Sequence, residues 1–238
     1  KAKKKYELTK RIFLEQSLHK LKTYFSKDLL NGVFNIFSFQ INKTLNQVNA
    51  SELKEPHLVQ LFNRFATYNG SSPYKTPGMM TLVQHLEQEY GTFVSDKGMQ
   101  NITNSLYNLA LRQGVDFKFN NYVSEILVSN KIATGIKVGD KTYESDIVIS
   151  NMDVVPTYRN LLKNHYQPEK ILNQERSSSA LIFYWGVKKE FKNLDLHNIF
   201  FSKDYKTEFQ TIFENNTISV DPTIYINITS KDVKGDAP

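Results

Sequence analysis

Apolar residues in the first half of the chain recur at the three- to four-residue spacing of helices that bury one face. One predicted helix begins near Pro56 and ends at the turn-forming run Asn-Gly-Ser-Ser-Pro of residues 69–73. Another is entered through Pro77 and stops at Gly91, which is the usual order of these two residues in a helix. The same spacing predicts further helices over residues 6–25 and 28–46 and within 94–117, the last closed by Gly114.

The hydrophobic period changes after the last of these helices. Alternating positions separated by short turns, such as the one at residues 139–140, are typical of hairpin-linked strands. The continuous apolar run Asp-Ile-Val-Ile-Ser that follows is typical of a strand buried on both faces, which suggests that it joins a larger sheet whose other strands come from elsewhere. The predicted strands are 123–129, 132–138, 142–144 and 146–150.

The last third of the chain combines a helix over about 154–173 with a second, antiparallel sheet. Three runs rich in aromatic and β-branched residues predict its strands, at 179–187, 197–201 and 222–229. The overall prediction is a mixed α and β fold.

Composition narrows the class of protein. The 238 residues include 16 Phe and 13 Tyr but no Cys, so the chain holds no disulfide, thiolate metal site or cysteine nucleophile. A net charge of +6 permits attraction to phosphates or anionic lipids. The aromatic residues are not interleaved with the basic ones and no recognition motif is present, so we do not expect nucleic-acid binding.

The most apolar stretch, residues 24–41, is interrupted by polar residues such as Lys27 and Asp28, so it is too polar to cross a bilayer. An aromatic-rich amphipathic segment beside a basic run suits a membrane surface, and a buried core helix is the alternative. The chain starts with Lys1 and ends in a loop-like segment, so we expect it to be a piece of a longer chain.

Standard catalytic motifs are missing. There is no GxGxxG, P-loop or GxSxG sequence, and the five scattered His residues predict no metal site. The segment 62–78, FNRFATYNGSSPYKTPG, is unusual because aromatic residues crowd a turn-rich stretch. Either it is the edge of a packed core, or it lines a pocket for an apolar ligand.

The same segment resembles the "rfatY-GssPy-aP" block of bacterial-type phytoene desaturases, a family of flavin-dependent carotenoid desaturases and isomerases. The likeness continues in order through HLEQEYGTFVSDKGM, VSEILVSNKIATGIKVGDKTYESDIVISNMD and SSALIFYWGV to DPTIYINITSKDVKGDAP. It covers roughly residues 56–238, and several blocks in the right order are more specific than any one of them.

The resemblance implies a domain plan. Such enzymes begin with a GxGxxG fingerprint and end with a second flavin-contacting segment, so this chain would be the middle of one. Residues 96–153 would be the middle segment of a Rossmann-like FAD-binding domain, with a helix, a β-meander and the rejoining strand 146–150. Residues 1–95 and 154–238 would form a substrate domain of helices on a mostly antiparallel sheet.

The resemblance also implies a reaction, the removal of a hydride from an allylic C–H bond of an apolar polyene to FAD. Such a site needs aromatic walls and few titratable residues. The sequence alone identifies no catalytic residue. The implied polyene-binding residues, for which plain core packing is the alternative, are Phe65, Tyr68, Tyr74, Tyr184 and Trp185.

The implied cofactor contacts lie in the middle segment. Lys97 stands where the family usually has the first glycine of Gly-Gly-Met, which puts close approach of the backbone to flavin in question. Asn151 and Asp153 follow the rejoining strand at the edge where nucleotides bind, and helix capping is the alternative for both. The full set of implied FAD contacts is Gly98, Met99, Val123, Asn151 and Asp153.

We therefore expect the central portion of a FAD-dependent carotenoid desaturase that is cytoplasmic and peripherally membrane-associated, with this piece alone inactive. Two alternatives stay open from sequence. One is a lipid-binding module without redox activity, and the other is a different amine-oxidase-like flavoenzyme that acts on polar substrates.

Overall fold

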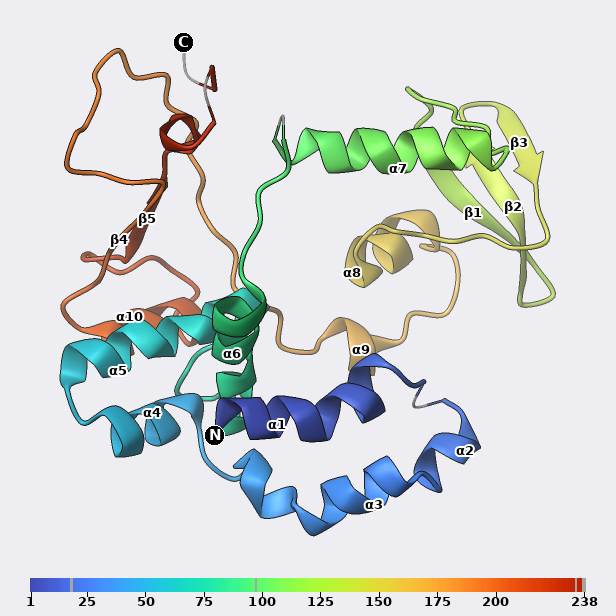
Figure 1. Cartoon of the computed structure of the whole chain (residues 1–238). Coiled ribbons are helices and arrows are strands. Elements are labelled where there is room, and N and C mark those ends of the chain that lie inside the picture. The colour runs from blue at the N-terminus through green and yellow to red at the C-terminus, as the bar shows by residue number, and fades with distance from the viewer. Residues whose placement is uncertain (18, 97, 234, 237–238) are drawn as a thin grey trace. The chain divides into compact units, whose positions relative to one another are not determined.

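The computed structural model describes residues 1–17, 19–96, 98–233 and 235–236. The chain forms two compact units (Figure 1): Lys1–Asn101 together with Ser177–Pro238, and Ile102–Arg176. Both combine helices with antiparallel strands, so the predicted mixture of α and β structure is confirmed.

Short helices dominate the first unit. Its 3-10 turns include Ile36–Phe39, Arg64–Asn69 and Gly78–Met80, and a π-helical turn covers Lys10–Leu14. The α-helices are α1 (Ala2–Thr9), α2 (Leu21–Tyr24), α3 (Lys27–Phe34), α4 (Leu45–Leu53), α5 (Pro56–Asn63), α6 (Thr81–Tyr90) and α10 (Tyr205–Phe213).

Local capping explains where α4 and α5 begin. Thr44 and Gln47 form a reciprocal capping box at α4, since each side chain bonds the backbone N–H of the other. Glu55 caps α5 by accepting from the N–H of Leu58, and Pro56 occupies the first turn. The two helices contact each other over a small core of Leu45, Phe65 and Ala66, with Phe62 and Val83 packed against it.

The two long N-terminal helices predicted from sequence are broken in the structure. The helix predicted over 6–25 ends in the π-helical turn, and Thr23 then bonds the backbone carbonyl of Ser17 with its hydroxyl, outside any helical pattern. The helix predicted over 28–46 ends at Phe34, and Gln40 adopts a left-handed backbone (φ 53°) before α4 begins. Capping and local side-chain bonds outweigh the apolar spacing here.

The second unit begins with α7 (Gln100–Arg112), which Gly114 closes in a left-handed conformation, as predicted. Three strands then form an antiparallel meander in the order β1-β2-β3. Gly135 is required there, because a Cβ atom on it would lie 2.1 Å from the carbonyl oxygen of Tyr143 on the neighbouring strand. The strands β1 (Val123–Ser129), β2 (Ile132–Val138) and β3 (Lys141–Glu144) confirm the predicted hairpins.

The sequence prediction and the structure differ at two places in the second unit. Residues 146–150 form no strand, and Ile147 and Ile149 are 74% and 87% exposed. The physical reason is that a strand exists only beside a hydrogen-bonded neighbour, and none of the described segments provides one. The helix predicted over 154–173 is interrupted before Pro168 and consists of α8 (Val154–Pro156), a π-helical turn (Thr157–Leu161) and α9 (Glu169–Leu172).

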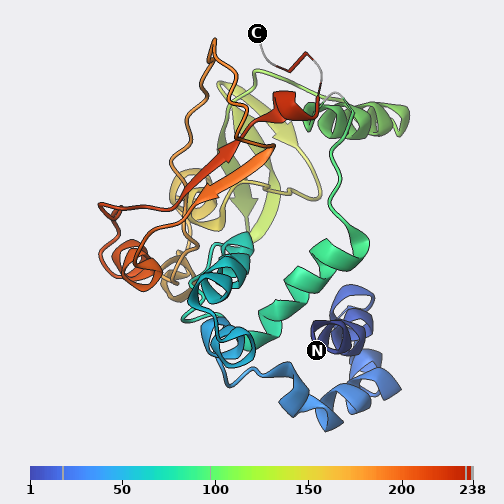
Figure 2. The ribbon, with the colours of Figure 1, turned by 60° about the vertical axis from the view of Figure 1, so that its left-hand side comes forward.

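The last part of the first unit contains β4 (His197–Phe200) and β5 (Ile224–Asn227), which pair in antiparallel fashion as predicted (Figure 2). The predicted strand 179–187 is again unpaired and is not a strand. Helix α10, capped by the Asp204 side chain on the N–H of Thr207, was not predicted.

Candidate functional site

Aromatic rings of the segment 62–78 form a stack that runs from the core to the surface. The 3-10 turn Arg64–Asn69 places the ring of Phe65 between those of Phe62 and Tyr68, with centroids 6.0 and 5.8 Å apart. Phe65 is 4% exposed, whereas Tyr68 is 56% exposed. Phe65 therefore packs as a core residue does, and Tyr68 is the ring that a ligand can reach.

A charged pair fixes the hydroxyl of Tyr68. The hydroxyl donates to one oxygen of the Glu87 carboxylate on α6, and the other oxygen lies 3.4 Å from Nη2 of Arg64. The Arg64 guanidinium also lies over the Phe65 ring, 4.8 Å from its centroid. Partial burial, and then the hydrogen bond to Glu87, raise the pKa of the Tyr68 phenol. The phenol stays a neutral donor, and its ring is held in one orientation.

Tyr74 belongs to a second aromatic cluster. Its ring meets that of Phe209 on α10 with centroids 6.3 Å apart, and Phe209 packs edge-on against Tyr205 at 4.9 Å. Burial, followed by the carboxylates of Asp204 and Glu208, raises the pKa of the Tyr74 phenol. Tyr74 thus anchors the turn-rich segment to a helix more than a hundred residues away in the chain.

Gly70 brings the aromatic turn against the segment that carries Tyr184 and Trp185. The N–H of Ser178 donates to the carbonyl of Gly70 over 2.9 Å, and a Cβ atom on Gly70 would lie 2.7 Å from Cβ of Ser177. Beyond this contact the chain is extended, and Tyr184 and Trp185 are 95% and 78% exposed. The structure therefore joins two of the sequence blocks but leaves both of these rings uncovered.

The extended segment keeps the side-chain alternation of a strand. The rings of Phe183 and Trp185, two residues apart, contact each other with centroids 6.0 Å apart. Tyr184 between them makes no such ring contact in the described part of the chain. Tyr184 and Trp185 therefore do not share a face.

The predicted flavin contacts are spread over both units. Gly98 has φ +77°, and no atom lies within 4 Å of the position that a Cβ atom on it would take. Met99 beside it is 70% exposed; both residues belong to the first unit, and Lys97 lies outside the described residues. Val123 opens β1 opposite Val138 in the second unit. The space beside Cα of Gly98 is therefore open, whereas its N–H and carbonyl are bonded to Ser95 and Asn101.

Asn151 and Asp153 differ in how their side chains are used. One oxygen of Asp153 accepts from the N–H of Val155 over 2.8 Å, which caps α8, and the other pairs with the Arg176 guanidinium. The bond to Val155, and then Arg176, hold the pKa of the Asp153 carboxyl below its usual range. The exposed amide of Asn151 makes no hydrogen bond within the described ranges. Asp153 is engaged in capping, and the Asn151 amide is available to a ligand.

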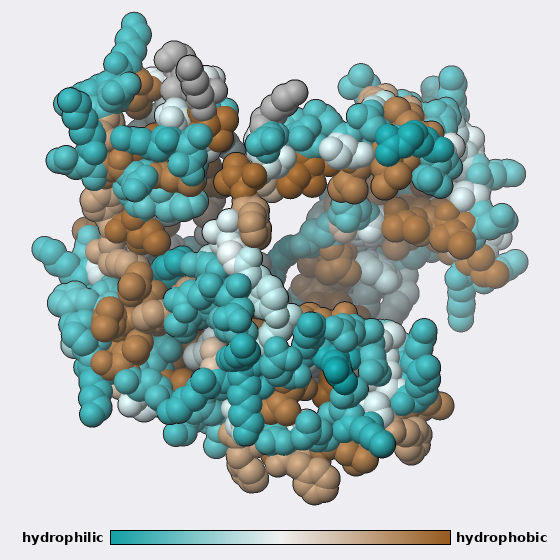
Figure 3. All heavy atoms as spheres, in the orientation of Figure 1, coloured by the Kyte–Doolittle hydropathy of each residue, from teal (hydrophilic) through white to brown (hydrophobic). Residues whose placement is uncertain are grey.

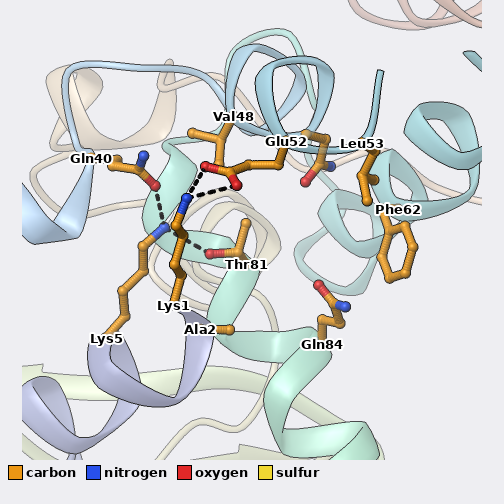
Figure 4. A pocket seen from close by; sticks show the side chains of 11 residues that line it. Lys1, Ala2, Lys5, Gln40, Val48, Glu52, Leu53, Phe62, Thr81 and Gln84 are labelled. Atoms are coloured by element: carbon orange, nitrogen blue, oxygen red, sulfur yellow. Dashed lines mark hydrogen bonds and ion pairs between the residues drawn. The ribbon is translucent and has the colours of Figure 1, made fainter. Parts of the chain in front are cut away.

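A cavity of about 300 Å³ lies among α1, α4 and α6 in the first unit (Figure 4). The Lys5 ammonium, on a residue 3% exposed, donates to Gln40, to Thr81 and to the carbonyl of Gly78 over 2.6–2.8 Å. Burial lowers the pKa of Lys5 to about 8, although the Glu52 carboxylate opposes this change. The predicted polyene-binding residues do not line this cavity.

Sequence reasoning missed the Arg64–Glu87 pair and the cluster on α10. No local sequence pattern indicates the Arg64–Glu87 pair, because its partners are 23 residues apart. The second had a readable signal, since Asp204 precedes apolar residues at helical spacing in Tyr205, Phe209 and Phe213.

Comparison with known proteins agrees with the resemblance that the sequence blocks indicate. A family described as "Flavin containing amine oxidoreductase" matches residues 10–193. A 1-hydroxycarotenoid 3,4-desaturase from Flavobacterium sp. (strain P99-3) is 54% identical over 237 residues, which is 100% of this chain and 48% of the relative.

Relatives with lower sequence identity are also named as an oxygenase and a desaturase. A 4,4'-diapolycopene oxygenase from Methylomonas sp is 31% identical over 85% of this chain and 41% of its own length. A phytoene desaturase from Fusarium fujikuroi is 31% identical over 84% of this chain and 35% of its own length. The chain thus spans about half or less of the length of these relatives.

Proposed function

Because the chain belongs to the family of flavin-containing amine oxidoreductases, we propose that it is the central portion of a FAD-dependent carotenoid desaturase. The observation that carries the proposal is the 54% identity to a 1-hydroxycarotenoid 3,4-desaturase along the whole chain. The family match establishes a flavin enzyme family, and the choice of FAD and of an acyclic carotenoid substrate is part of the proposal.

Uncovered apolar surface in each unit supports a role within a larger flavoprotein. In the second unit, one face of α7 carries Ile102, Leu106 and Leu109, which are 46%, 61% and 45% exposed, and the run 146–150 is unpaired. In the first unit, the segment 179–187 is also unpaired. We propose that 146–150 completes the sheet of the FAD-binding domain, whose other strands would come from outside this chain.

The residues present fit a dinucleotide in the second unit. The Asn151 amide is free to donate and accept hydrogen bonds, and Val123 is the first residue of β1 that pairs with β2. Both can therefore contact the adenosine part of FAD. Asp153 holds the start of α8 in place beside Asn151. In the first unit, Gly98 and Met99 leave room for close approach. When bound, the flavin would accept the hydride removed from an allylic C–H bond of the substrate.

The aromatic residues would position the polyene. Tyr68 offers a ring face whose orientation is fixed through Glu87, and Tyr184 and Trp185 add exposed rings, of which at most one faces a given polyene. Apolar and aromatic walls exclude water from the reacting carbons, and ring faces favour developing positive charge. Phe65 supports the Tyr68 ring from the core side, and Tyr74 anchors the turn to α10.

The test is to purify the full-length protein and measure bound FAD and turnover of acyclic carotenoids, with and without a 1-hydroxy group, in lipid. We expect stoichiometric FAD and a product that has lost one hydride and one proton and gained one conjugated double bond. Absence of flavin together with lipid binding would favour a module without redox activity. Turnover of amines instead of polyenes would favour an enzyme for polar substrates.

We also propose that the full-length protein associates peripherally with membranes in the cytoplasm. None of the helices in the described ranges is long and apolar enough to cross a bilayer. A carotenoid is insoluble in water, so its enzyme must meet it at or in a lipid surface.

A further inference from the structure

Exposed apolar side chains do not by themselves distinguish a ligand site in this chain. Figure 3 shows apolar residues (brown) interspersed with hydrophilic residues (teal) in both units, and many large apolar side chains are more than half exposed. A hydrogen-bonding group beside an exposed ring is more specific, because it favours ligands that carry the matching donor. Tyr68 has such a group at its hydroxyl, the carboxylate of Glu87.

The Glu87 carboxylate has capacity to accept a further hydrogen bond. Its Oε2 accepts from the Tyr68 hydroxyl, whereas its Oε1 lies 3.4 Å from Nη2 of Arg64. Charge-assisted bonds between a guanidinium and a carboxylate are usually about 2.7–2.9 Å long, so the pair with Arg64 is loose. A carboxylate offers about four acceptor positions, and the Glu87 side chain is 27% exposed. A ligand can therefore donate a hydrogen bond to Oε1.

Arg64 allows this carboxylate to stay charged beside aromatic rings. The guanidinium lies over the Phe65 ring, 4.8 Å from its centroid, and its Nε is buried without a hydrogen-bond partner in the described part of the chain. Its positive charge offsets the negative charge of Glu87 where an apolar ligand excludes water. A ligand made only of hydrocarbon would take water from Oε1 and give no donor in return, which weakens binding. A ligand with a hydroxyl at this position would supply the donor.

We propose that Glu87 accepts a hydrogen bond from the 1-hydroxy group of an acyclic carotenoid and so determines a preference for hydroxylated substrates. The inference rests on the proposed function and deepens it, because it names the group that recognises one end of the substrate. In a 1-hydroxycarotenoid the hydroxyl is on C1, two bonds from C3. Binding at this hydroxyl would therefore hold the neighbouring carbons against the ring of Tyr68, whose hydroxyl is bonded to the same carboxylate.

The test measures kcat/KM of the full-length, flavin-loaded protein for a detergent-dispersed 1-hydroxycarotenoid and for the same carotenoid without the hydroxyl. The ratio of the two values does not depend on how much of the enzyme is folded or loaded with flavin. We expect wild type to prefer the hydroxylated substrate by about 10- to 100-fold, the usual range for a hydrogen bond to a charged group. Glu87→Leu cannot accept a hydrogen bond and should bring the ratio close to one.

A third substrate separates the hydroxyl proton from the oxygen that carries it. A 1-methoxycarotenoid keeps the oxygen but cannot donate, so wild type should use it as poorly as the carotenoid without oxygen. The amide of Glu87→Gln can donate as well as accept, so this variant should discriminate less between the hydroxy and methoxy substrates. Tyr68→Phe leaves the carboxylate in place and should keep the preference for the hydroxyl.

Two matched controls should leave the ratio unchanged. Glu89→Gln removes a carboxylate from the same helix, and the pair of Glu89 with Lys3 is likewise 3.4 Å long. Tyr225→Phe removes the hydroxyl of another tyrosine in the first unit, which is bonded to His197. Tyr225 is 55% exposed, against 56% for Tyr68.

The outcomes distinguish this inference from the proposed function. If Glu87→Leu lowers kcat/KM for both substrates by the same factor, Glu87 only supports the fold and its assignment to the hydroxyl is overturned. Equal use of both substrates by wild type overturns the assignment too. In either case desaturation is observed, so the proposed desaturase function stands. Failure of the wild-type protein to desaturate any of the substrates overturns the proposed function, and this inference with it.

Discussion

The carbonyl of Gly70 accepts a hydrogen bond from the N–H of Ser178, and this contact joins two sequence blocks that lie more than a hundred residues apart. It depends on glycine for two reasons. The residue has φ +59°, and a Cβ atom on it would lie 2.7 Å from Cβ of Ser177. The close approach decides where the segment bearing Tyr184 and Trp185 leaves the body of the first unit.

Gly70→Ala should therefore destabilise the full-length protein by more than the cost of the left-handed backbone alone. Left-handed backbone costs a non-glycine residue about 1–2 kcal/mol, and displacing Ser177 adds an overpacking cost of about 1–3 kcal/mol. The matched control is Gly139→Ala, since Gly139 has φ +57° with nothing within 4 Å of its Cβ position. Thermal unfolding of both variants gives the comparison. Equal losses would show that the contact with Ser177 relaxes without cost.

Lys5 should make stability depend on pH above neutrality. Its pKa is lowered to about 8 in the folded protein by burial, whereas an unfolded lysine titrates near 10.5. Between these values the unfolded state binds more protons, so the free energy of unfolding rises with pH. Below pH 8 the buried Lys5 ammonium is charged, and this charge lowers the free energy of unfolding by an upper limit on the order of 3 kcal/mol.

The measurement is the melting temperature from pH 7 to 10.5 for wild type and for Lys5→Met. The difference between them should move in favour of wild type as pH rises. Lys3→Met serves as the control, because the Lys3 side chain is 65% exposed and its pair with Glu89 is long at 3.4 Å. Parallel curves for wild type and Lys5→Met would contradict the assignment.

Substitutions at Asn151 and Asp153 should have different effects, because we expect Asn151 to contact the ligand and Asp153 to cap α8. Asn151→Ala should lower FAD affinity by fivefold or more, the loss of one or two hydrogen bonds, with little change in the melting temperature of the apoprotein. Asp153→Ala should lower the melting temperature through loss of the cap on α8. Asp153→Asn should restore most of it, since asparagine caps equally well.

Flavin absorbance after dialysis and thermal unfolding of the apoprotein are the two readouts. If Asp153→Asn restores stability but loses FAD, its carboxylate contacts the cofactor, and the capping interpretation is incomplete. If Asn151→Ala retains FAD fully, the nucleotide does not use this amide.

The parts of the fold that the sequence predicted are those specified locally. The meander β1-β2-β3 follows from alternation and turns within 22 residues, and Gly91 and Gly114 end their helices where expected. The strands that were predicted but do not form in this chain depend on distant partners. Residues 146–150 and 179–187 have the composition of strands, but pairing is a property of two segments, and a sequence pattern describes only one.

The same distinction applies to the candidate site. The aromatic crowding of residues 62–78 was visible in the sequence, and so were its two interpretations. The structure supports the core interpretation for Phe65, which is buried, and places Tyr68 at the surface. The bond from Tyr68 to Glu87 could not be read from spacing, because it links a 3-10 turn to the next helix.

Phe65 and Tyr68, whose rings stack 5.8 Å apart, should respond oppositely to truncation in the full-length enzyme. Phe65→Ala removes a ring that is 4% exposed, and loss of a buried aromatic costs about 3–5 kcal/mol. Tyr68→Ala removes a ring that is 56% exposed, and most surface substitutions cost well under 1 kcal/mol; losing the hydrogen bond to Glu87 adds about 1 kcal/mol. If Tyr68 walls the polyene site, its variant should therefore melt close to wild type yet desaturate carotenoid several-fold more slowly. Tyr68→Phe keeps the ring and should retain most turnover, which separates the ring from the hydroxyl. The paired measurement is thermal unfolding without substrate and product formation per bound flavin in lipid. Normal turnover per folded Tyr68→Ala enzyme would remove Tyr68 from the polyene site.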